Sequence, residues 1–198
     1  MKPARASDMI PPEILIQAYQ TGWFPMGDED TGEIRWYSPD PRGILPLDAF
    51  HVPRRLQRVV QQGRFEIRFD EAFEDVMRGC ADRGETWITE PIIDVYVTLH
   101  RLGIAHSVEA WQDGALAGGL YGVSIGGAFF GESMFHRVTD ASKVALAALV
   151  QRLRSRGFLL LDIQWTTPHL EQFGAAEISR GRYLRLLRDA VHADVSFD

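Results

Sequence analysis

Residues 127–164 read GAFFGESMFHRVTDASKVALAALVQRLRSRGFLLLDIQ, and this stretch decides the fold. Its first part, 128–135, is aromatic and apolar enough for a buried strand, apart from Glu132 at its centre. The middle part has apolar residues at helical spacing behind several candidate N-caps, and it ends at Gly157. The last part, 158–161, is a continuous apolar run of strand length, which favours an interior strand. We therefore expect strand, helix and strand within a layered α/β unit.

Two polar residues, Asp162 and Gln164, close the last apolar run two positions apart. Side chains at i and i+2 of a strand project from the same face, so we expect these two to stand side by side. Ligand crevices in α/β sheets lie at the carboxyl ends of parallel strands. If Glu132 is on a neighbouring strand, three polar groups converge in an apolar setting. This pattern fits a functional site, and it fits equally well a strand cap beside a carboxylate paired with an arginine.

The composition is that of an ordinary globular protein. With 198 residues, the chain forms one domain or a small domain attached to a larger one. The single cysteine, Cys80, rules out an intramolecular disulfide and fits a reducing cytosol. Residues 1–8 show no apolar signal segment, and the apolar runs are too short to span a bilayer. We expect a cytoplasmic protein without a membrane partner.

The net charge of −6 argues by itself against a nucleic-acid partner, but the basic residues are clustered. All of them except Lys2 and Lys143 are arginines, whose guanidinium suits bidentate phosphate contact and base stacking. One cluster, Arg54, Arg55 and Arg58, lies on an expected short helix. A solvated surface explains any single cluster more simply. One or two such patches would nevertheless be enough for a sequence-indifferent contact with an RNA helix.

The first third of the chain predicts short elements. A helix begins at Pro11 or Pro12. Its expected apolar stripe consists of Ile14, Leu15, Ala18 and Tyr19. The segments that follow are an apolar loop (Trp23 to Met26), a strand (Ile34 to Tyr37), a rigid turn (Ser38 to Gly43), a strand (Ile44 to Leu47) and a helix (Pro53 to Gln61). We place a soft domain boundary near Gly63.

The remaining two thirds predict an α/β arrangement built around a three-stranded antiparallel meander. The expected elements before the quoted stretch are a strand (Phe65 to Phe69), two helices (Glu71 to Cys80 and Pro91 to Leu102) and two strands (Ala105 to Trp111 and Ala115 to Val123). The strand 128–135 completes the meander, and further helices begin at Pro168 and Ser179.

Eight short motifs follow one another along the chain. They are Trp36–Arg42 (WYSPDPR), Thr86–Thr89 (TWIT), His106–Glu109 (HSVE), Gly118–Gly122 (GGLYG), Gly131–Phe135 (GESMF), Ala141–Lys143 (ASK), Asp162–Gln164 (DIQ) and His169–Leu170 (HL). In this order they resemble the leucyl/phenylalanyl-tRNA–protein transferase family, from about Leu15 to Leu187. One pentapeptide would be a weak signal, whereas eight ordered motifs are specific.

The resemblance implies an α+β, layered fold of the GNAT-like acyl-CoA N-acyltransferase type. It also implies a small N-terminal domain, residues 1–63, before a catalytic domain, residues 64–198. Members are aminoacyltransferases, or leucyltransferases, that move leucine or phenylalanine from aminoacyl-tRNA to the α-amine of proteins beginning with Arg or Lys. This transfer marks those proteins for degradation under the N-end rule. Donor tRNA and acceptor protein are thus the expected partners.

The family resemblance also suggests roles for individual residues. The family positions of Asp162 and Gln164 carry catalytic roles. A neutral amide is too weak a base to act alone, so we expect Gln164 to orient the attacking amine while Asp162 holds its NH₂ group or takes up the proton through it. Glu132 matches a substrate-site position, which we interpret as an acidic wall selecting a cationic first residue. The other expected substrate contacts are Met26, Trp36, Trp87, Leu120, Phe129, Ser133 and Leu149, with Arg54, Arg55 and Arg58 tentatively on the tRNA.

Two departures from the family or fold pattern limit these expectations. The loop His136–Ala141 has no glycine, and Asp140 lies where a CoA pyrophosphate would sit in a CoA-dependent enzyme, so we expect no CoA and no cofactor. Met26 stands where the family commonly has tryptophan. A flexible thioether leaves a different cavity, and the choice of leucine, phenylalanine or methionine as donor stays open.

Two other kinds of site are disfavoured, and two alternative functions stay open. Cys80 has no catalytic motif around it, and the histidines lack metal-ligand spacing, so we expect an inert thiol and no metal. His106 is expected to be structural. The alternatives are a CoA-dependent GNAT N-acyltransferase and a non-catalytic binder of basic N-termini. Under the transferase hypothesis, Asp162→Ala should abolish transfer and leave the fold intact, and Glu132→Gln should reduce discrimination for basic acceptors.

Overall fold

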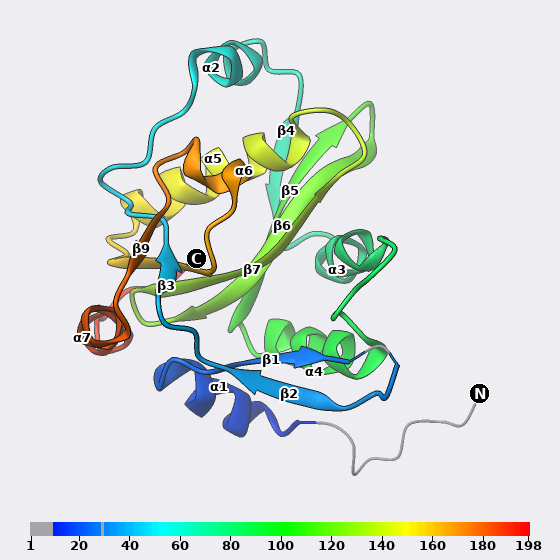
Figure 1. The fold of residues 1–198 in the computed structure, drawn as a ribbon. Helices are drawn as coiled ribbons and strands as arrows, with labels where there is room; N and C mark the ends of the chain where they lie inside the picture. The colour runs from blue at the N-terminus through cyan, green and yellow to red at the C-terminus, as the bar shows by residue number, and fades with distance from the viewer. Residues whose placement is uncertain (1–9, 29) are drawn as a thin grey trace.

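A seven-stranded sheet runs through the centre of the computed structural model, which describes residues 10–28 and 30–198 (Figure 1). The strand order is β4–β5–β6–β7–β8–β3–β9. Neighbouring strands are antiparallel except for β7 and β8, which are parallel. The strands are β3 (Arg42–Ile44), β4 (Glu66–Phe69), β5 (Ala105–Gln112), β6 (Ala115–Ile125), β7 (Ala128–His136), β8 (Leu160–Gln164) and β9 (Ala176–Ile178).

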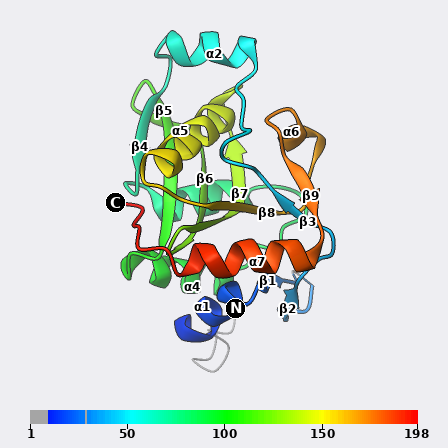
Figure 2. The same ribbon diagram turned by 90° about the vertical axis from the view of Figure 1, so that its left-hand side faces the viewer.

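Helices cover both faces of the sheet, and each face has its own hydrophobic core (Figures 1 and 2). The first face packs against α1 (Pro12–Gln20), α3 (Phe73–Ala81), α4 (Glu90–Arg101) and α7 (Arg180–Val191). The second face packs against α2 (Arg54–Gln61), α5 (Ala141–Ser155) and α6 (Pro168–Glu171). The expected α+β layered architecture is confirmed.

The meander and the strand–helix–strand unit form where the sequence predicts them. Strands β5, β6 and β7 are consecutive antiparallel neighbours. Helix α5 then carries the chain over the sheet to β8, which lies inside the sheet between β7 and β3. These elements are predictable because hydrophobic periodicity and glycine turns are local signals.

The N-terminal part differs from expectation in three places. The predicted apolar loop at Trp23–Met26 is instead largely a strand, β1 (Phe24–Gly27), which pairs with β2 (Ile34–Tyr37) in a separate two-stranded sheet. Ile14 is 49% exposed, so the buried stripe of α1 is narrower than predicted and consists of Leu15 and Tyr19.

The third difference concerns the strand expected at Ile44–Leu47, which lies earlier, at Arg42–Ile44. It pairs with β8 on one side and β9 on the other. In this strand the guanidinium of Arg42 lies beside Asp162. Residues 42–44 therefore hydrogen-bond within the large sheet, although they precede the expected boundary near Gly63.

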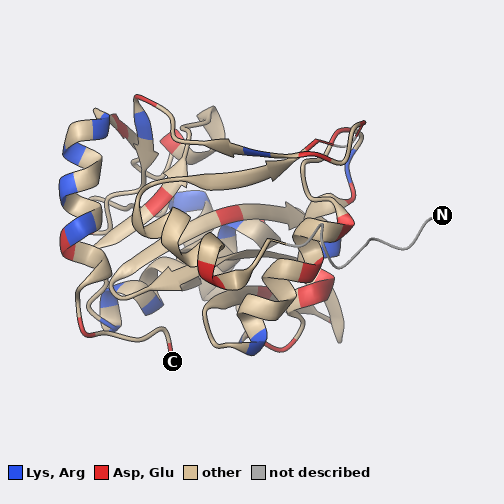
Figure 3. Cartoon of the chain, turned by 90° about the horizontal axis from the view of Figure 1, so that it is seen from below, with Lys and Arg blue, Asp and Glu red and all other residues tan. Residues whose placement is uncertain are grey.

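The surface charge of the described residues is uneven. Arginines gather along α7, the upright helix at the left of Figure 3, where Arg182, Arg185 and Arg188 are exposed. Among the described residues, none of the helices is long and apolar enough to cross a membrane.

Candidate active site

A cavity lies where the parallel strands β7 and β8 stop pairing. Their register runs from Ala128↔Leu160 to Phe130↔Asp162 and ends there. The next residues of both strands line a cavity of about 310 Å³. Its walls also come from β1, β6, α5, α6 and the loop before α4. The carboxyl ends of parallel strands are a frequent location of ligand sites, and this volume suits a small-molecule or side-chain pocket.

A β-bulge aims Glu132 into this cavity. In the β6–β7 ladder, Gly122 pairs with Gly131 and Tyr121 pairs with Ser133, which leaves Glu132 as the extra residue. The bulge begins immediately after the last residue that pairs with β8. Glu132 therefore lines the cavity although it lies in the middle of a strand.

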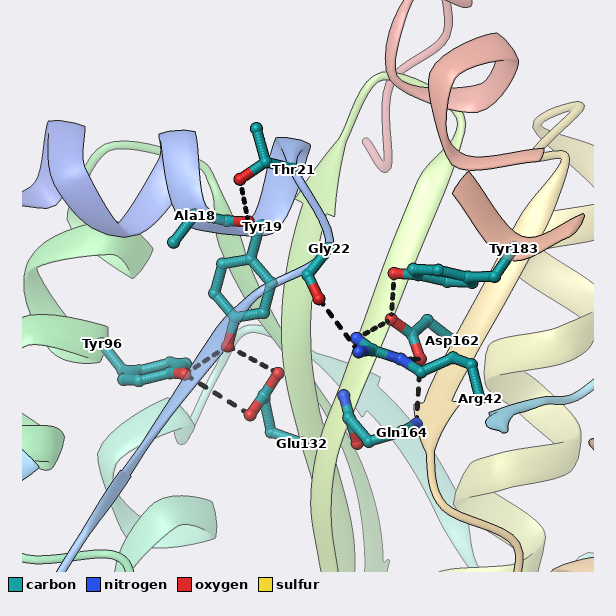
Figure 4. Close-up of polar contacts among 10 residues, drawn as sticks. All are labelled: Ala18, Tyr19, Thr21, Gly22, Arg42, Tyr96, Glu132, Asp162, Gln164 and Tyr183. Carbon is teal, nitrogen blue, oxygen red and sulfur yellow. Dashed lines mark hydrogen bonds and ion pairs between the residues drawn. The ribbon is translucent and has the colours of Figure 1, made fainter. Parts of the chain in front are cut away.

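The backbone of Gln164 turns its side chain to the same cavity. Alternation along β8 brings Leu161 and Ile163 to the cavity, while Asp162 does not line it. Gln164 would follow Asp162, but its φ of 57° is left-handed and reverses this direction. In Figure 4 the amide of Gln164 points toward Glu132, and the carboxylate of Asp162 points toward Tyr183. The prediction that Asp162 and Gln164 share one face is therefore wrong.

Asp162 is held in a fully buried ion pair with Arg42 (Figure 4). Arg42 Nε donates to Oδ1 at 3.0 Å and Nη2 donates to Oδ2 at 2.7 Å. The carboxylate also accepts the hydroxyl of Tyr183 at 2.7 Å and the backbone N–H of Gln164 at 2.9 Å. The third arm of the guanidinium donates to the carbonyl of Gly22 at 3.0 Å. Sequence reasoning missed Arg42, since its only sign is an arginine within a motif, 120 residues from its partner.

The contact of Asp162 with Gln164 thus differs from the predicted one. Asp162 holds the backbone of Gln164 and not its side-chain NH₂ group. The side-chain Nε2 of Gln164 is buried and has no hydrogen-bond partner among the described residues. Tyr121 lines the same cavity, and its buried hydroxyl also has no hydrogen-bond partner within residues 10–28 and 30–198. Unpaired buried polar groups are costly, so two of them at one cavity point to a polar ligand.

Two tyrosines hold the carboxylate of Glu132. Tyr19 donates its hydroxyl to Oε1 at 2.7 Å, and Tyr96 donates to Oε2 at 3.4 Å. The two hydroxyls are also in hydrogen-bond contact with each other. Because each has a single proton to donate, all three contacts are satisfied together only when the carboxyl group of Glu132 supplies a proton to one of them. Burial raises the pKa of Glu132 to about 8, against hydrogen bonds from Tyr19 that lower it. Glu132 therefore changes charge near neutral pH.

Most of the predicted substrate contacts meet at this cavity. Its lining includes Met26, Trp87, Leu120, Ser133 and Leu149, together with Glu132 and Gln164. Sequence reasoning did not select several other lining residues, among them Phe24, Arg83, Trp165 and His169. Arg83 donates to the hydroxyl of Ser133 at 3.2 Å.

Two predicted contacts lie away from the cavity. Phe129 is fully buried in the core on the α5 side and stacks on Phe197. Trp36 lines a shallow hollow beside Trp23 on the surface of α1. Strand alternation explains Phe129, whose neighbour Phe130 faces the other core.

Comparison with known proteins shows which family the chain belongs to. The family described as leucyl/phenylalanyl-tRNA protein transferase matches residues 44–188, and its N-terminal domain matches residues 8–40. A relative in Salinibacter ruber that carries the name leucyl/phenylalanyl-tRNA–protein transferase is 56% identical, over 96% of this chain and 84% of the relative. A relative of the same name in Gloeobacter violaceus is 55% identical over 95% of this chain and 97% of the relative. A third, in Paramagnetospirillum magneticum, is 57% identical over 94% of this chain and 91% of the relative.

The chain belongs to the leucyl/phenylalanyl-tRNA–protein transferase family. The two family regions adjoin near Pro41, just before β3 enters the large sheet. A solved structure of a DUF2156 domain from Agrobacterium fabrum is far more distant, with a TM-score of 0.44 and 14% identity over 92% of this chain and 57% of that one.

In this transferase family member, the three arginines selected from the sequence lie on α2. Arg54, Arg55 and Arg58 are exposed, while Leu56 and Val59 bury the other side of the helix. Arg55 approaches Asp140 at 3.3 Å, at the start of α5. Asp140 also pairs with Lys143 at 3.1 Å.

The structure also describes the cysteine and the histidine for which the sequence disfavours catalysis or metal binding. Cys80 is buried, and burial raises the pKa of its thiol to about 12, which makes it unreactive. His106 Nδ1 hydrogen-bonds Asp70 at 2.8 Å, and its ring stacks on Phe197. Together with Asp198 they form a group of potential metal ligands within 4.8 Å that sequence spacing could not reveal, since Asp198 comes from the end of the chain. The expectation of no metal stays a prediction.

Proposed function

We propose that this protein transfers leucine or phenylalanine from aminoacyl-tRNA to the α-amine of proteins whose first residue is Arg or Lys, in the cytoplasm, and so marks them for degradation. Family membership supports aminoacyl transfer. The observation that carries the finer proposal is a cavity with a mainly apolar lining that holds one carboxylate, Glu132, where β7 and β8 stop pairing.

The apolar lining suits the side chain of the donor amino acid. It includes Leu120 from β6, Leu149 from α5, and Met26 and Trp87. A pocket of about 310 Å³ with such walls accommodates leucine or phenylalanine and would exclude charged side chains.

The polar groups of the cavity suit the attacking amine. Aminolysis of an ester needs a neutral amine held against the carbonyl carbon and donors for the developing oxyanion. Within residues 10–28 and 30–198 the amide nitrogen of Gln164 has no hydrogen-bond partner, and its position at the cavity supports a contact with the reacting groups. Asp162 is a positioning residue in this scheme, because it binds the backbone of Gln164 and its carboxylate is occupied by Arg42. Glu132 is the acidic group that faces a cationic acceptor.

A CoA-dependent reaction has less support. A CoA pyrophosphate would need free backbone amides at the start of α5. There the acidic Asp140 is the N-cap, with its carboxylate engaged by Lys143 and Arg55. This arrangement favours an aminoacyl-tRNA donor, whose phosphates would meet the exposed arginines of α2.

The decisive assay incubates the protein with leucyl-tRNA labelled in the amino acid and a peptide that begins with Arg. We expect label on the peptide. Activity with acetyl-CoA alone would support the acyltransferase alternative, and peptide binding without transfer would support the non-catalytic one. Gln164→Ala should lower kcat by about 10²–10³, the usual effect of removing one group at the reacting carbonyl. Gln20→Ala, at the exposed end of α1 and away from α2, is the matched control and should transfer normally.

A further inference from the structure

We propose that Glu132 is the catalytic group that takes the proton from the attacking amine, a role that the positions of Asp162 and Gln164 leave open. The proposal rests on the proposed function, and it gives Glu132 a chemical step in addition to its contact with the acceptor.

Asp162 is badly placed to accept this proton. Its two oxygens receive four donors, from Arg42 twice, from Tyr183 and from the backbone of Gln164. Neither it nor Arg42 has exposed surface, and Asp162 does not line the cavity. Relay through Gln164 would need the amide to bond Asp162, whereas the contact between these residues is through the backbone N–H. A proton on Asp162 would also break a buried charge pair, which is costly.

Glu132 has the position that Asp162 lacks. Of the described residues that line the cavity, it alone carries a carboxyl group. It sits on the bulge of β7 directly beyond the last pairing with β8, and the amide of Gln164 points toward it from the other strand (Figure 4). An amine held by Gln164 against the carbonyl carbon therefore has the carboxylate of Glu132 on its other side.

The surroundings of Glu132 hold it in place and tune its acidity. Six charged or titratable groups interact electrostatically with it: Tyr19 from α1, Arg42 from β3, Tyr96 from α4, Tyr121 from β6, Asp162 from β8 and Tyr183 from α7. Arg83, from the loop before α4, and His169, from α6, line the same cavity. Burial raises the pKa of Glu132 to about 8, with opposing hydrogen bonds from Tyr19. The α-amine of a peptide has an ordinary pKa of about 7.7–8.0. Proton transfer between groups of matched pKa is efficient near neutral pH.

The step balances with this one base. The neutral amine nitrogen attacks the ester carbonyl carbon, and the C–N bond forms as a nitrogen proton passes to the carboxylate of Glu132. The C–O bond to the terminal ribose then breaks, and the departing ribose oxygen takes the proton from Glu132. Glu132 returns to the carboxylate, and the products are an amide and a tRNA with a free ribose hydroxyl.

The first test separates proton transfer from acceptor selection. Glu132→Gln keeps the shape of the side chain, and Glu90→Gln, on the surface of α4, is the matched control. Two peptides are compared, one beginning with Arg and one with citrulline, which has the same shape without the charge. We expect Glu132→Gln to lower kcat by about 10²–10⁴ with both peptides, the usual contribution of a general base. A loss confined to the Arg peptide would overturn the proposal and leave Glu132 as a selectivity residue.

The second test uses the pH dependence of kcat in single-turnover reactions. The wild-type kcat should rise with pH and level off above about pH 8. The Glu132→Gln variant should lack this rising limb. The same measurement with an acceptor whose α-amine is more acidic distinguishes the two titrations. A limb that is due to the amine moves to lower pH with that acceptor, whereas a limb that is due to Glu132 stays at the same pH. Tyr96→Phe removes a hydrogen bond to the carboxylate and should move the limb to higher pH.

A third variant guards against misfolding. In Glu132→Ala, formate can enter the space of the missing carboxylate, and we expect it to restore part of the transfer in proportion to its concentration. The proton role alone would be overturned if the wild-type protein transfers and the Glu132→Gln variant keeps both a normal kcat and the same rising limb. Absence of transfer by the wild-type protein would instead overturn the proposed function.

Discussion

Arg42 and Asp162 join strands β3 and β8 through a bidentate ion pair in which neither side chain has any exposed surface. Tyr183 and Gly22 complete the hydrogen bonding of the pair. The pair therefore ties α7 and the turn after α1 to the strand that carries Gln164. Its geometry makes Asp162 part of the support of the cavity.

This pair leads to a prediction about stability. Removing one partner leaves an uncompensated buried charge, so Arg42→Met and Asp162→Ala should each lower the free energy of unfolding by about 3–5 kcal/mol. The double variant Arg42→Met/Asp162→Leu should lose less than the sum of the single losses, because no charge stays unpaired. Urea denaturation measures all three, and strictly additive losses would contradict the coupling. The sequence alone led us to expect that Asp162→Ala leaves the fold intact, whereas the buried ion pair leads us to expect a loss of stability.

The limits of the sequence are clear at the same residues. Glu132 is recognisable because a carboxylate within an aromatic strand is costly unless it has a function or a partner. The β7–α5–β8 unit follows from local periodicity. The partner of Asp162 is 120 residues away in the chain, and pairing over that distance leaves no local pattern. The left-handed backbone of Gln164 is equally hidden, since glycine, and not glutamine, usually marks such a position.

A second prediction concerns the pH dependence of stability. Folding raises the pKa of Glu132 from an ordinary 4.5 to about 8, so the folded protein holds a proton that the unfolded chain releases between these values. The stabilisation is complete below about pH 4.5 and is lost as pH rises through about 8, on the order of a few kcal/mol. Thermal unfolding of the wild type and of Glu132→Gln should therefore differ in slope across this range, with the variant less sensitive to pH. Parallel curves would show that Glu132 is ionised throughout.

A third prediction concerns the choice of donor. Met26 and Leu149 both line the cavity, and Met26→Trp places a larger, rigid ring there. Overfilling a pocket costs about 1–3 kcal/mol, so transfer of phenylalanine should fall by roughly 10–100-fold relative to leucine. Competition between leucyl-tRNA and phenylalanyl-tRNA gives the ratio directly. Trp36→Ala, outside the cavity, is the control, and a shift of the ratio in that variant would return Trp36 to the substrate site.

The last prediction concerns the binding of tRNA. Arg54 and Arg58 are exposed on α2 and have no ion-pair partner in the described part of the chain, while their neighbour Arg55 is paired with Asp140. Arg54→Glu/Arg58→Glu should raise KM for aminoacyl-tRNA and leave kcat unchanged, because these residues lie outside the cavity. The slope of log affinity against log salt should fall by about one for each phosphate that the variant no longer binds. The single variant Arg58→Glu is compared with the control Arg101→Glu, at the exposed end of α4, because both change the net charge by the same amount. An equal rise of KM in that control would show that net charge, and not the α2 surface, governs the binding of tRNA.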